Sequence, residues 1–238
     1  MNEKITIIMP MGGVGIRFKR ENFKIEKPFL NINGTPLFLN TLKSFKKIRI
    51  INEIILIIRK NLKKDIKLFL DNRDFFRNKK FKIVVLNKKT RNPIETIIKS
   101  KAKVSNKKII CLDNDLYFKS SKYFKKIINK NCADSIVPTF VSDKNIYSFV
   151  KHKGKKVLDI KEKKIISKTA VAGAYFFRDK TSFFKQCEKI NKSKKIKDKY
   201  ISTVILNYIK NKKKVEQYKT EKYLSYGTPK EYLKNIEK

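Results

Sequence analysis

The chain has 238 residues, 41% of them hydrophobic, and its 60 lysines and arginines against 21 acidic residues give a formal net charge of +39. No stretch approaches the ~18 consecutive apolar residues that a membrane-spanning helix needs, and the first residues show no signal-peptide pattern, so we expect a cytoplasmic protein without membrane insertion. The three cysteines lie far apart and there is one histidine, which excludes a zinc cluster and favours a reducing compartment.

The positive charge is spread along the whole chain. There is no basic arm and no aromatic stacking motif among the basic residues, and most of them are lysine. An excess of Lys, Ile and Asn is what a strongly AT-rich coding sequence produces, so we interpret the charge as a solvated surface and expect no stable nucleic-acid partner. Two alternatives stay open, a polyanionic partner and the steering of phosphorylated substrates towards a site. A single contiguous basic face would favour a nucleic-acid-binding protein, whose affinity would fall steeply with salt.

Strands and helices alternate through the first half of the chain. Apolar runs predict buried strands, and apolar residues at helical spacing predict helices. In chain order we predict a strand at Ile5–Met9, an extended piece at Phe29–Asn31, a helix over Leu37–Ile48, a strand at Glu53–Ile58, a helix at Leu62–Leu70, a strand at Phe81–Leu86, a helix at Pro93–Ala102 and a strand at Lys108–Leu112. This alternation predicts an α/β fold, with a Rossmann-like, mostly parallel sheet flanked by helices. Ligands of such sheets bind beyond the carboxyl ends of the strands.

The second half of the chain is predicted to be mixed. Here we predict strands at Ser135–Phe140, Ser148–Lys151 and Val157–Ile160, a strand at Ala170–Phe177, helices at Phe183–Ile190 and Ile201–Ile209, a strand at Val215–Tyr218 and a last helix from Lys230. We expect antiparallel strands that supply an acceptor-binding subregion on the same sheet. No linker, repeat or low-complexity block divides the sequence, which predicts one domain over residues 1–238 and leaves a homo-oligomer open.

A glycine-rich stretch, Met9–Arg17, follows the first predicted strand. Closely spaced glycines let backbone N–H groups approach a polyphosphate without interference from a Cβ atom and form an anion-binding nest. The stretch is not a Walker A loop, because no Gly-Lys-Ser/Thr follows it. A dinucleotide-binding dehydrogenase is disfavoured because Phe18 stands where G-x-G-x-x-G needs its last glycine, and because Arg59 ends the second main strand where an acidic residue is expected.

Further motifs follow the glycine stretch at intervals along nearly the whole chain. They are Lys27-Pro28 with Asn33-Gly34-Thr35-Pro36, the acidic turn Asp113-Asn114-Asp115, the pair Glu162-Lys163, the segment Ala170–Tyr175, and Tyr226-Gly227-Thr228-Pro229. In content and order the set resembles the motifs of the sugar-1-phosphate nucleotidyltransferases, the nucleoside-diphosphate-sugar pyrophosphorylases. One such motif carries little weight, whereas a series in the family's order indicates a nucleotidyltransferase.

The resemblance implies a role for each matching residue. Arg17 would stabilise the β- and γ-phosphates and the leaving pyrophosphate, and Lys27 would bridge the α-phosphate and the acceptor phosphate. Asp115 would hold Mg²⁺, the implied cofactor. The implied nucleotide-binding residues are Met11, Gly12, Gly13, Val14, Gly15, Asn92 and Asp113. The implied acceptor-binding residues are Glu162, Lys163 and Gly173.

The chain departs from the family's pattern at three positions. Ile16 replaces the usual Ser or Thr, which removes a hydroxyl contact to phosphate, and Thr35 replaces Lys at a position expected on the surface. Ser225 stands where many members have an Asp that completes the metal site. Mg²⁺ would then be held by one carboxylate, the nucleotide phosphates and water, which suits the few protein ligands that it takes in phosphate sites.

The implied reaction is attack by a phosphate oxygen of the acceptor on the α-phosphorus of an NTP, with pyrophosphate as the leaving group. Because the nucleophile is already an anion, the protein must supply charge neutralisation and in-line positioning rather than a general base. The acceptor that the resemblance implies is a sugar-1-phosphate, giving an NDP-sugar for surface polysaccharide synthesis. The changes at Ile16, Thr35 and Ser225 keep open a non-sugar phosphate, such as a phosphorylated alcohol or a choline-like group, in a cytidylyltransferase-like reaction.

Overall fold

The computed structural model describes residues 3–71, 76 and 78–236. The strands are β1 (Ile5–Met11), β2 (Asn31–Ile32), β3 (Thr35–Pro36), β4 (Ile51–Arg59), β5 (Lys80–Leu86), β6 (Lys108–Leu112), β7 (Leu116–Lys119), β8 (Ser135–Val141), β9 (Ser148–Lys153), β10 (Lys156–Glu162), β11 (Thr169–Val171), β12 (Ala174–Phe177), β13 (Val215–Lys219) and β14 (Lys222–Ser225). The α-helices are α1 (Ile16–Arg20), α2 (Leu37–Lys43), α3 (Lys63–Asp71), α4 (Pro93–Ile98), α5 (Ser121–Ile128), α6 (Lys180–Lys192), α7 (Ile201–Lys210) and α8 (Pro229–Ile236). Short 3₁₀ turns lie at Lys27–Phe29, Lys60–Leu62 and Lys101–Lys103.

A ten-stranded sheet in the order β11-β9-β10-β13-β8-β12-β6-β1-β4-β5 runs through both halves of the chain. The strands β6, β1, β4 and β5 are parallel neighbours, which confirms the prediction for the first half. For the whole sheet the prediction of a mostly parallel arrangement is wrong, because β12 lies antiparallel between β6 and β8. The expectation of an antiparallel second half is wrong for β13, which is parallel to β8. Helices α6 and α7 lie between these two strands in the chain and provide the long crossover that parallel neighbours need.

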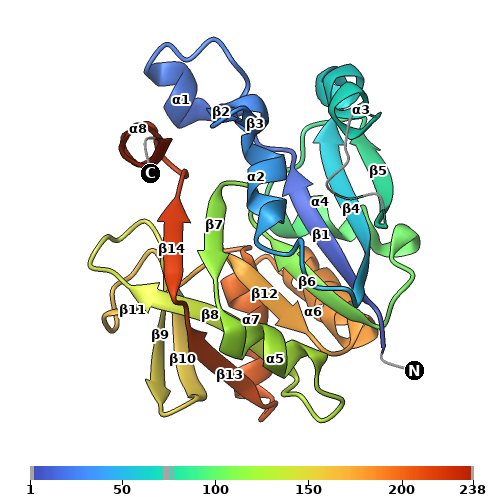
Figure 1. The fold of residues 1–238 in the computed structure, drawn as a ribbon. Helices are drawn as coiled ribbons and strands as arrows, with labels where there is room; N and C mark the ends of the chain where they lie inside the picture. The colour runs from blue at the N-terminus through green and yellow to red at the C-terminus, as the bar shows by residue number, and fades with distance from the viewer. Residues whose placement is uncertain (1–2, 72–75, 77, 237–238) are drawn as a thin grey trace.

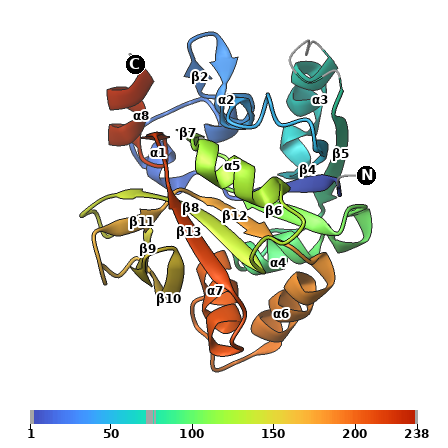
Figure 2. The ribbon, with the colours of Figure 1, turned by 60° about the horizontal axis from the view of Figure 1, so that its bottom comes forward.

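Helices cover both faces of the sheet (Figure 2). Alternate residues of a strand point to opposite faces, so the apolar run of β1 serves both layers. Ile7 and Met9 belong to the core formed with α2, α3 and α5. Ile8 belongs to the core formed with α4, α6 and α7. A run without polar alternation is therefore what a strand buried on both faces requires.

A third, smaller core joins the beginning of the chain to its end. Phe18 and Leu37 are buried with Tyr226 and Tyr232. The rings of Phe18 and Tyr232 meet edge to face, with centroids 6.2 Å apart. The contact places α1 beside α8, beyond the end of β1 (Figure 1). Residues that lie at opposite ends of the sequence thus meet at one end of the sheet.

Several elements differ from the sequence-based prediction. The helix predicted as far as Ile48 ends at Lys43 and continues as turns, and the helix predicted over Pro93–Ala102 ends at Ile98. Helices α1 and α5 and strands β7 and β14 are absent from that prediction. The helix α1 is five residues long and the strands β7 and β14 are four residues each, so local periodicity carries little sign of them. The helix α5 does have a local signal, the cap Ser120, whose hydroxyl accepts from the Tyr123 backbone N–H.

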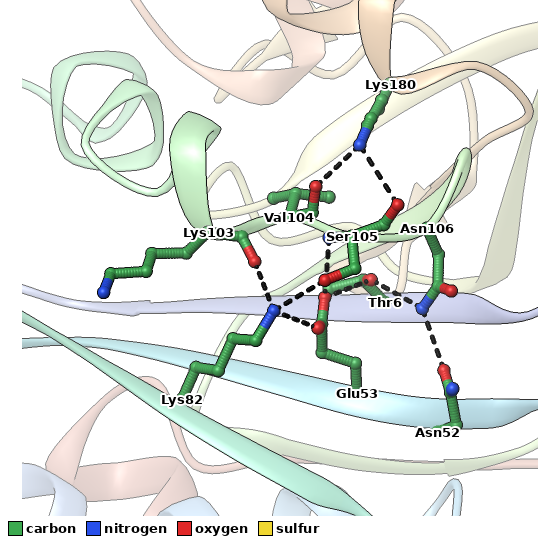
Figure 3. A network of polar contacts seen from close by, with 9 residues as sticks. All are labelled: Thr6, Asn52, Glu53, Lys82, Lys103, Val104, Ser105, Asn106 and Lys180. Carbon is green, nitrogen blue, oxygen red and sulfur yellow. Dashed lines mark hydrogen bonds and ion pairs between the residues drawn. The ribbon is translucent and has the colours of Figure 1, made fainter.

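A buried polar network ties the amino-terminal ends of the parallel strands together (Figure 3). Glu53 on β4 is 3% exposed, and its carboxylate accepts hydrogen bonds from the Thr6 hydroxyl at 2.7 Å and the Ser105 backbone N–H at 3.0 Å. It also forms an ion pair with Lys82 of β5. Burial alone would raise the pKa of Glu53, but Lys82, Ser105 and Thr6 stabilise the ionised carboxylate and hold its pKa below the ordinary value.

Replacing Lys82 with methionine is expected to lower the free energy of unfolding by about 3–5 kcal/mol, because it leaves a buried carboxylate without its cation. The pKa of Glu53 is lowered in the folded state, so its contribution is present above the unfolded pKa and is lost as pH falls through the folded pKa. The gap between wild type and Lys82→Met in urea unfolding should therefore shrink below pH ~4. The control is Lys101→Met, whose partner Glu188 has a side chain that is 37% exposed, with an expected loss of about 0–1 kcal/mol. Equal losses in the two variants would contradict a buried role for Glu53.

Candidate active site

A cavity of about 200 Å³ collects six of the predicted site residues: Arg17, Lys27, Asp113, Asp115, Glu162 and Gly173. They come from α1, from the 3₁₀ turn that follows it, from the loop after β6, from the end of β10 and from the residue before β12. The structure therefore brings together residues that are up to about 150 positions apart in the sequence. This is the carboxyl end of β6, where the topology of a parallel sheet places ligands.

Lys27 is fixed inside the cavity. Its ammonium forms an ion pair with the carboxylate of Asp115 and lies 3.5 Å from the carbonyl oxygen of Gly227. It also stands 5.4 Å from the centroid of the Phe18 ring. The side chains of Lys27 and Asp115 are 18% and 24% exposed, so the charge is held in place and still faces the cavity.

The backbone around Lys27 is positioned by two local features. Glu26 forms an ion pair at 2.7 Å with Arg59 at the end of β4, which ties the turn to the sheet. Gly15 has φ +65°, and a Cβ atom added there would lie 3.3 Å from the Cβ of Lys27. The last glycine of the loop thus adopts a left-handed conformation and leaves room for Lys27 to pack against it.

Arg17 is exposed on α1 and lines the same cavity. Within the described part of the chain no carboxylate pairs with it. Its guanidinium is therefore available to an anionic ligand, and its planar fork suits phosphate oxygens.

The acidic turn after β6 depends on Gly173. The backbone N–H of Asp113 donates a 2.8 Å hydrogen bond to the carbonyl of Gly173. Gly173 has φ +60°, and a Cβ atom there would lie 2.6 Å from Asp113 Oδ2 and 2.5 Å from Leu116 Cδ2. The single strand predicted over Ala170–Phe177 is accordingly wrong, because the chain bends at this glycine and forms two strands, β11 and β12. The bend makes space for the acidic turn.

The carboxylates of Asp113 and Asp115 crowd the cavity with negative charge. Removal from water by the surrounding protein raises the pKa of Asp113. The negative charges of Asp115 and Glu162 add to this rise, and the positive charge of Lys27 opposes it. Water still reaches the Asp113 side chain within the cavity. An oxygen-only donor set beside Arg17 and Lys27 suits Mg²⁺ shared with phosphates. Among the described residues, no three His, Cys, Asp or Glu side chains are arranged to hold a metal ion by themselves.

The pairing of β7 with β14 brings the end of the chain to this turn. Leu116 pairs with Ser225, and the backbone N–H of Tyr226 donates a 2.8 Å hydrogen bond to the carbonyl of Asp115. A Cβ atom on Gly227 would lie 3.4 Å from Asp115 Oδ2, so the two residues are in close contact. Ser225, which stands where many sugar-1-phosphate nucleotidyltransferases have an Asp, lines the same cavity.

Glu231 of α8 is a cavity residue that the sequence analysis did not select. It is 5% exposed, and its carboxylate accepts hydrogen bonds from Tyr147, from Ser225 at 3.0 Å and from Thr228 at 3.1 Å. The spacing Thr228-x-x-Glu231 is a capping-box pattern, and the Thr228 hydroxyl accepts from the Glu231 backbone N–H at 3.2 Å. That signal predicts the start of α8, but no local pattern shows that this carboxylate reaches a cavity.

The predicted acceptor pair Glu162-Lys163 is divided by the structure. Glu162 lines the cavity, and one of its oxygens accepts hydrogen bonds from Ser148 and, at 2.8 Å, from Ser202. Lys163 is exposed, and its ammonium lies 3.1 Å from the Tyr200 hydroxyl and 4.6 Å from the centre of that ring. It is not among the residues that line the cavity.

The predicted nucleotide-binding residues mostly lie outside this cavity. Met11 is buried in the core and Asn92 caps α4, accepting a 2.9 Å hydrogen bond from the Glu95 backbone N–H. A Cβ atom on Gly12 would lie 2.8 Å from Leu86, which lines a second hollow of about 550 Å³ with residues 87–91. Gly13, Val14 and Gly15 continue the loop and line neither hollow. The loop therefore runs from the second hollow towards Arg17.

Comparison with known proteins relates this arrangement to solved structures. No protein-family model matches the chain, and no curated protein sequence matches it. A nucleoside-diphosphate-sugar pyrophosphorylase from Vibrio cholerae RC9 superposes with a TM-score of 0.80 at 20% identity, over 98% of this chain and 100% of its own. The inositol-1-phosphate CTP transferase of T. maritima gives 0.78 at 12% identity, over 97% and 93%. The UDP-glucose pyrophosphorylase of Acinetobacter baumanii gives 0.75 at 17% identity, over 99% and 92%.

The chain has a nucleotidyltransferase fold. The α/β fold with helices flanking the sheet, expected from the alternation of strands and helices, agrees with these superpositions, which extend over nearly the full length. The described helices include none that is long and apolar enough to cross a membrane.

Proposed function

We propose that this chain is a nucleotidyltransferase that joins an NTP to a small phosphorylated acceptor and releases pyrophosphate. The observation that carries the proposal is the meeting of Arg17, Lys27, Asp113 and Asp115 in one cavity of a nucleotidyltransferase fold. The motif resemblance supports a sugar-1-phosphate acceptor and a role in surface polysaccharide synthesis. The sparse, widely spaced cysteines support a cytoplasmic location, and the sheet shared by both halves of the chain supports a single domain over residues 1–238. A non-sugar phosphate stays the second candidate, because the fold is shared with an inositol-1-phosphate CTP transferase.

In this reaction an oxygen of the acceptor phosphate forms a bond to the α-phosphorus, and the bond from the α-phosphorus to the bridging oxygen breaks, so that pyrophosphate leaves with the electron pair. Lys27, held by Asp115 and Gly227, would neutralise charge between the two reacting phosphates. Arg17, which has no internal partner among the described residues, would bind the β- and γ-phosphates. Catalysis would thus rest on positioning and electrostatic stabilisation.

Asp115 would hold a Mg²⁺ ion together with the nucleotide phosphates and water, and Asp113 would help to bind the nucleotide; the ion would supply further charge neutralisation. Asp115 also acts independently of the ion, because its carboxylate orients the ammonium of Lys27. Glu162, with one oxygen held by Ser148 and Ser202, would present its other oxygen to the acceptor.

The test is to incubate the protein with Mg²⁺, each of the four common NTPs and a panel of phosphorylated acceptors, and to follow the release of pyrophosphate. With a combination of NTP and acceptor that supports turnover, Arg17→Ala is expected to lower kcat/KM roughly 10- to 100-fold, the effect of losing a charge-assisted hydrogen bond. Arg20→Ala, on the same helix and outside the cavity, is the matched control. If no combination in the panel released pyrophosphate, and Arg17→Ala bound NTP as the wild type does, the proposal would be wrong.

A further inference from the structure

The cavity is acidic within a strongly basic protein. The chain has 60 basic and 21 acidic residues, yet the cavity carries two cations, Arg17 and Lys27, and four carboxylates, Asp113, Asp115, Glu162 and Glu231. Asp115 is paired with Lys27, and Asp113 lies on the same turn, so both belong to the region where phosphate would bind. Glu162 and Glu231 remain as additional negative charge. A phosphorylated acceptor is itself an anion, and these two carboxylates favour one that also carries a positive charge.

Three hydroxyl groups of the cavity are already engaged with these carboxylates, and the Tyr175 hydroxyl lies 3.5 Å from that of Ser148. Tyr147 and Ser225 donate to Glu231, and Ser148 donates to Glu162. Sugar hydroxyls need both donors and acceptors, and a site that has committed its donors offers few of them. Glu231 accepts from three hydroxyls, so what it offers a ligand is chiefly its charge. A negatively charged carboxylate with no free hydrogen-bond donors beside it is complementary to a cation.

Aromatic rings border Glu231. The rings of Tyr147 and Tyr223 line the cavity, with centroids 6.3 Å apart and planes at 78°. Phe140 packs against both, stacked on Tyr223 at 3.8 Å and edge to face with Tyr147 at 5.0 Å, and so fixes their orientation. Burial and the hydrogen bond to Glu231 raise the pKa of Tyr147, so its phenol stays neutral. The faces of neutral aromatic rings attract ammonium groups, most strongly where water is displaced.

One ammonium of the protein already approaches this carboxylate. Lys144 lies 3.8 Å from Glu231 Oε1, with a side chain that is 55% exposed. An ion pair of that length and exposure is weak and competes with solvent. A ligand ammonium that brings its own phosphate to Lys27 would therefore displace Lys144 at little cost, because Lys144 can return to water.

We propose that the acceptor of this enzyme carries an ammonium group, held by Glu231 and the ring faces of Tyr147 and Tyr223 while its phosphate lies beside Lys27. The proposal rests on the proposed function and specifies its substrate. Two classes of compound carry both groups, the phosphorylated amino alcohols and the amino-sugar phosphates. Both present the same pairing of one cation and one phosphate in a small molecule.

The experiment compares acceptors with and without a positive charge. Phosphocholine is paired with 3,3-dimethylbutyl phosphate, its uncharged isostere, and glucosamine 1-phosphate with N-acetylglucosamine 1-phosphate. Each is offered with Mg²⁺ and the NTP that supports turnover, and pyrophosphate release is measured. We expect the charged member of at least one pair to have a kcat/KM about 10- to 100-fold higher, and the pair in which this occurs identifies the source.

Variants then assign the preference to Glu231. Glu231→Gln keeps the size of the side chain and one of its two accepting oxygens, enough for Ser225 and Thr228. It is expected to remove the preference by raising KM for the charged acceptor about 10- to 100-fold with KM for NTP unchanged. Asp143→Asn removes an exposed carboxylate close to Lys144 in sequence and outside the cavity, and should keep the preference. Tyr147→Leu removes the ring and provides a second test. Thermal unfolding of each variant separates loss of fold from loss of recognition.

The outcomes distinguish the two levels of the proposal. Turnover of neutral phosphates with no advantage for the charged member of either pair overturns the ammonium site and leaves the nucleotidyltransferase function standing. The ammonium site is likewise overturned if folded Glu231→Gln lowers kcat/KM equally for charged and neutral acceptors. Absence of turnover with every NTP and every phosphate overturns both.

Discussion

Replacing Lys27 with alanine is expected to lower turnover about 10²- to 10³-fold while NTP affinity falls by less than about tenfold. The ammonium is held by Asp115 and the carbonyl of Gly227, between the acidic turn and the C-terminal segment. In that position it faces the charge that develops as the acceptor phosphate approaches the α-phosphate. An interaction that strengthens in the transition state affects kcat more than substrate binding.

The measurement is steady-state kinetics of pyrophosphate release, with NTP affinity obtained separately by calorimetry. Lys24→Ala is the matched control, because Lys24 is exposed three residues earlier and does not line the cavity. It should retain wild-type turnover. A Lys27→Ala variant that loses only NTP affinity, with kcat unchanged, would place Lys27 in ground-state binding and contradict the assigned role.

Replacing Gly173 with alanine is expected to reduce kcat/KM by about 10²-fold or more, the effect of displacing reacting groups by roughly 1 Å. The new Cβ atom would lie 2.6 Å from Asp113 Oδ2 and 2.5 Å from Leu116 Cδ2, so the acidic turn must move. The backbone at φ +60° adds a strain of about 1–2 kcal/mol for any residue with a side chain. Kinetics of pyrophosphate release and thermal unfolding measure the two effects.

A matched control separates strain from displacement. Gly154, in the turn between β9 and β10, has φ +56° and nothing within 4 Å of an added Cβ atom. Gly154→Ala therefore carries a similar backbone strain without a collision, and should lower stability by about 1–2 kcal/mol while keeping activity. If both glycine variants lost activity to the same extent, strain alone would account for the effect, and the contact with Asp113 would carry no weight.

The parallel half of the fold and the core of the candidate site were accessible from the sequence. The strands β1, β4 and β6 are largely apolar runs buried within the sheet, and β5 at its edge ends in the apolar residues 83–86; such runs can be recognised in a single segment. Arg17, Lys27 and Asp115 stand in motifs that follow predicted strands, so a parallel sheet places them at one edge. Their roles in catalysis stay predictions until the variants are measured.

The rest of the site was beyond local patterns because it depends on distant pairings. Tyr147 and Glu231 meet across 84 positions, and Asp115 reaches Gly227 only because β7 pairs with β14. Lys163 stands next to Glu162 in the sequence, yet its side chain turns to Tyr200 and leaves the cavity. Adjacent residues of a strand end point in different directions, which spacing alone does not resolve.

By itself, then, the sequence determined the glycine loop after β1, the acidic turn after β6 and the lysine between them, because each is a short-range pattern with a physical reason to form. The tertiary structure decided the strand order, the break at Gly173 and the charge and aromatic lining of the cavity around Glu231. Those features arise from contacts between segments far apart in the chain, which no local periodicity specifies. The acidic, ring-lined surface around Glu231 belongs to this second group, and from it comes the expectation of an acceptor that bears a positive charge.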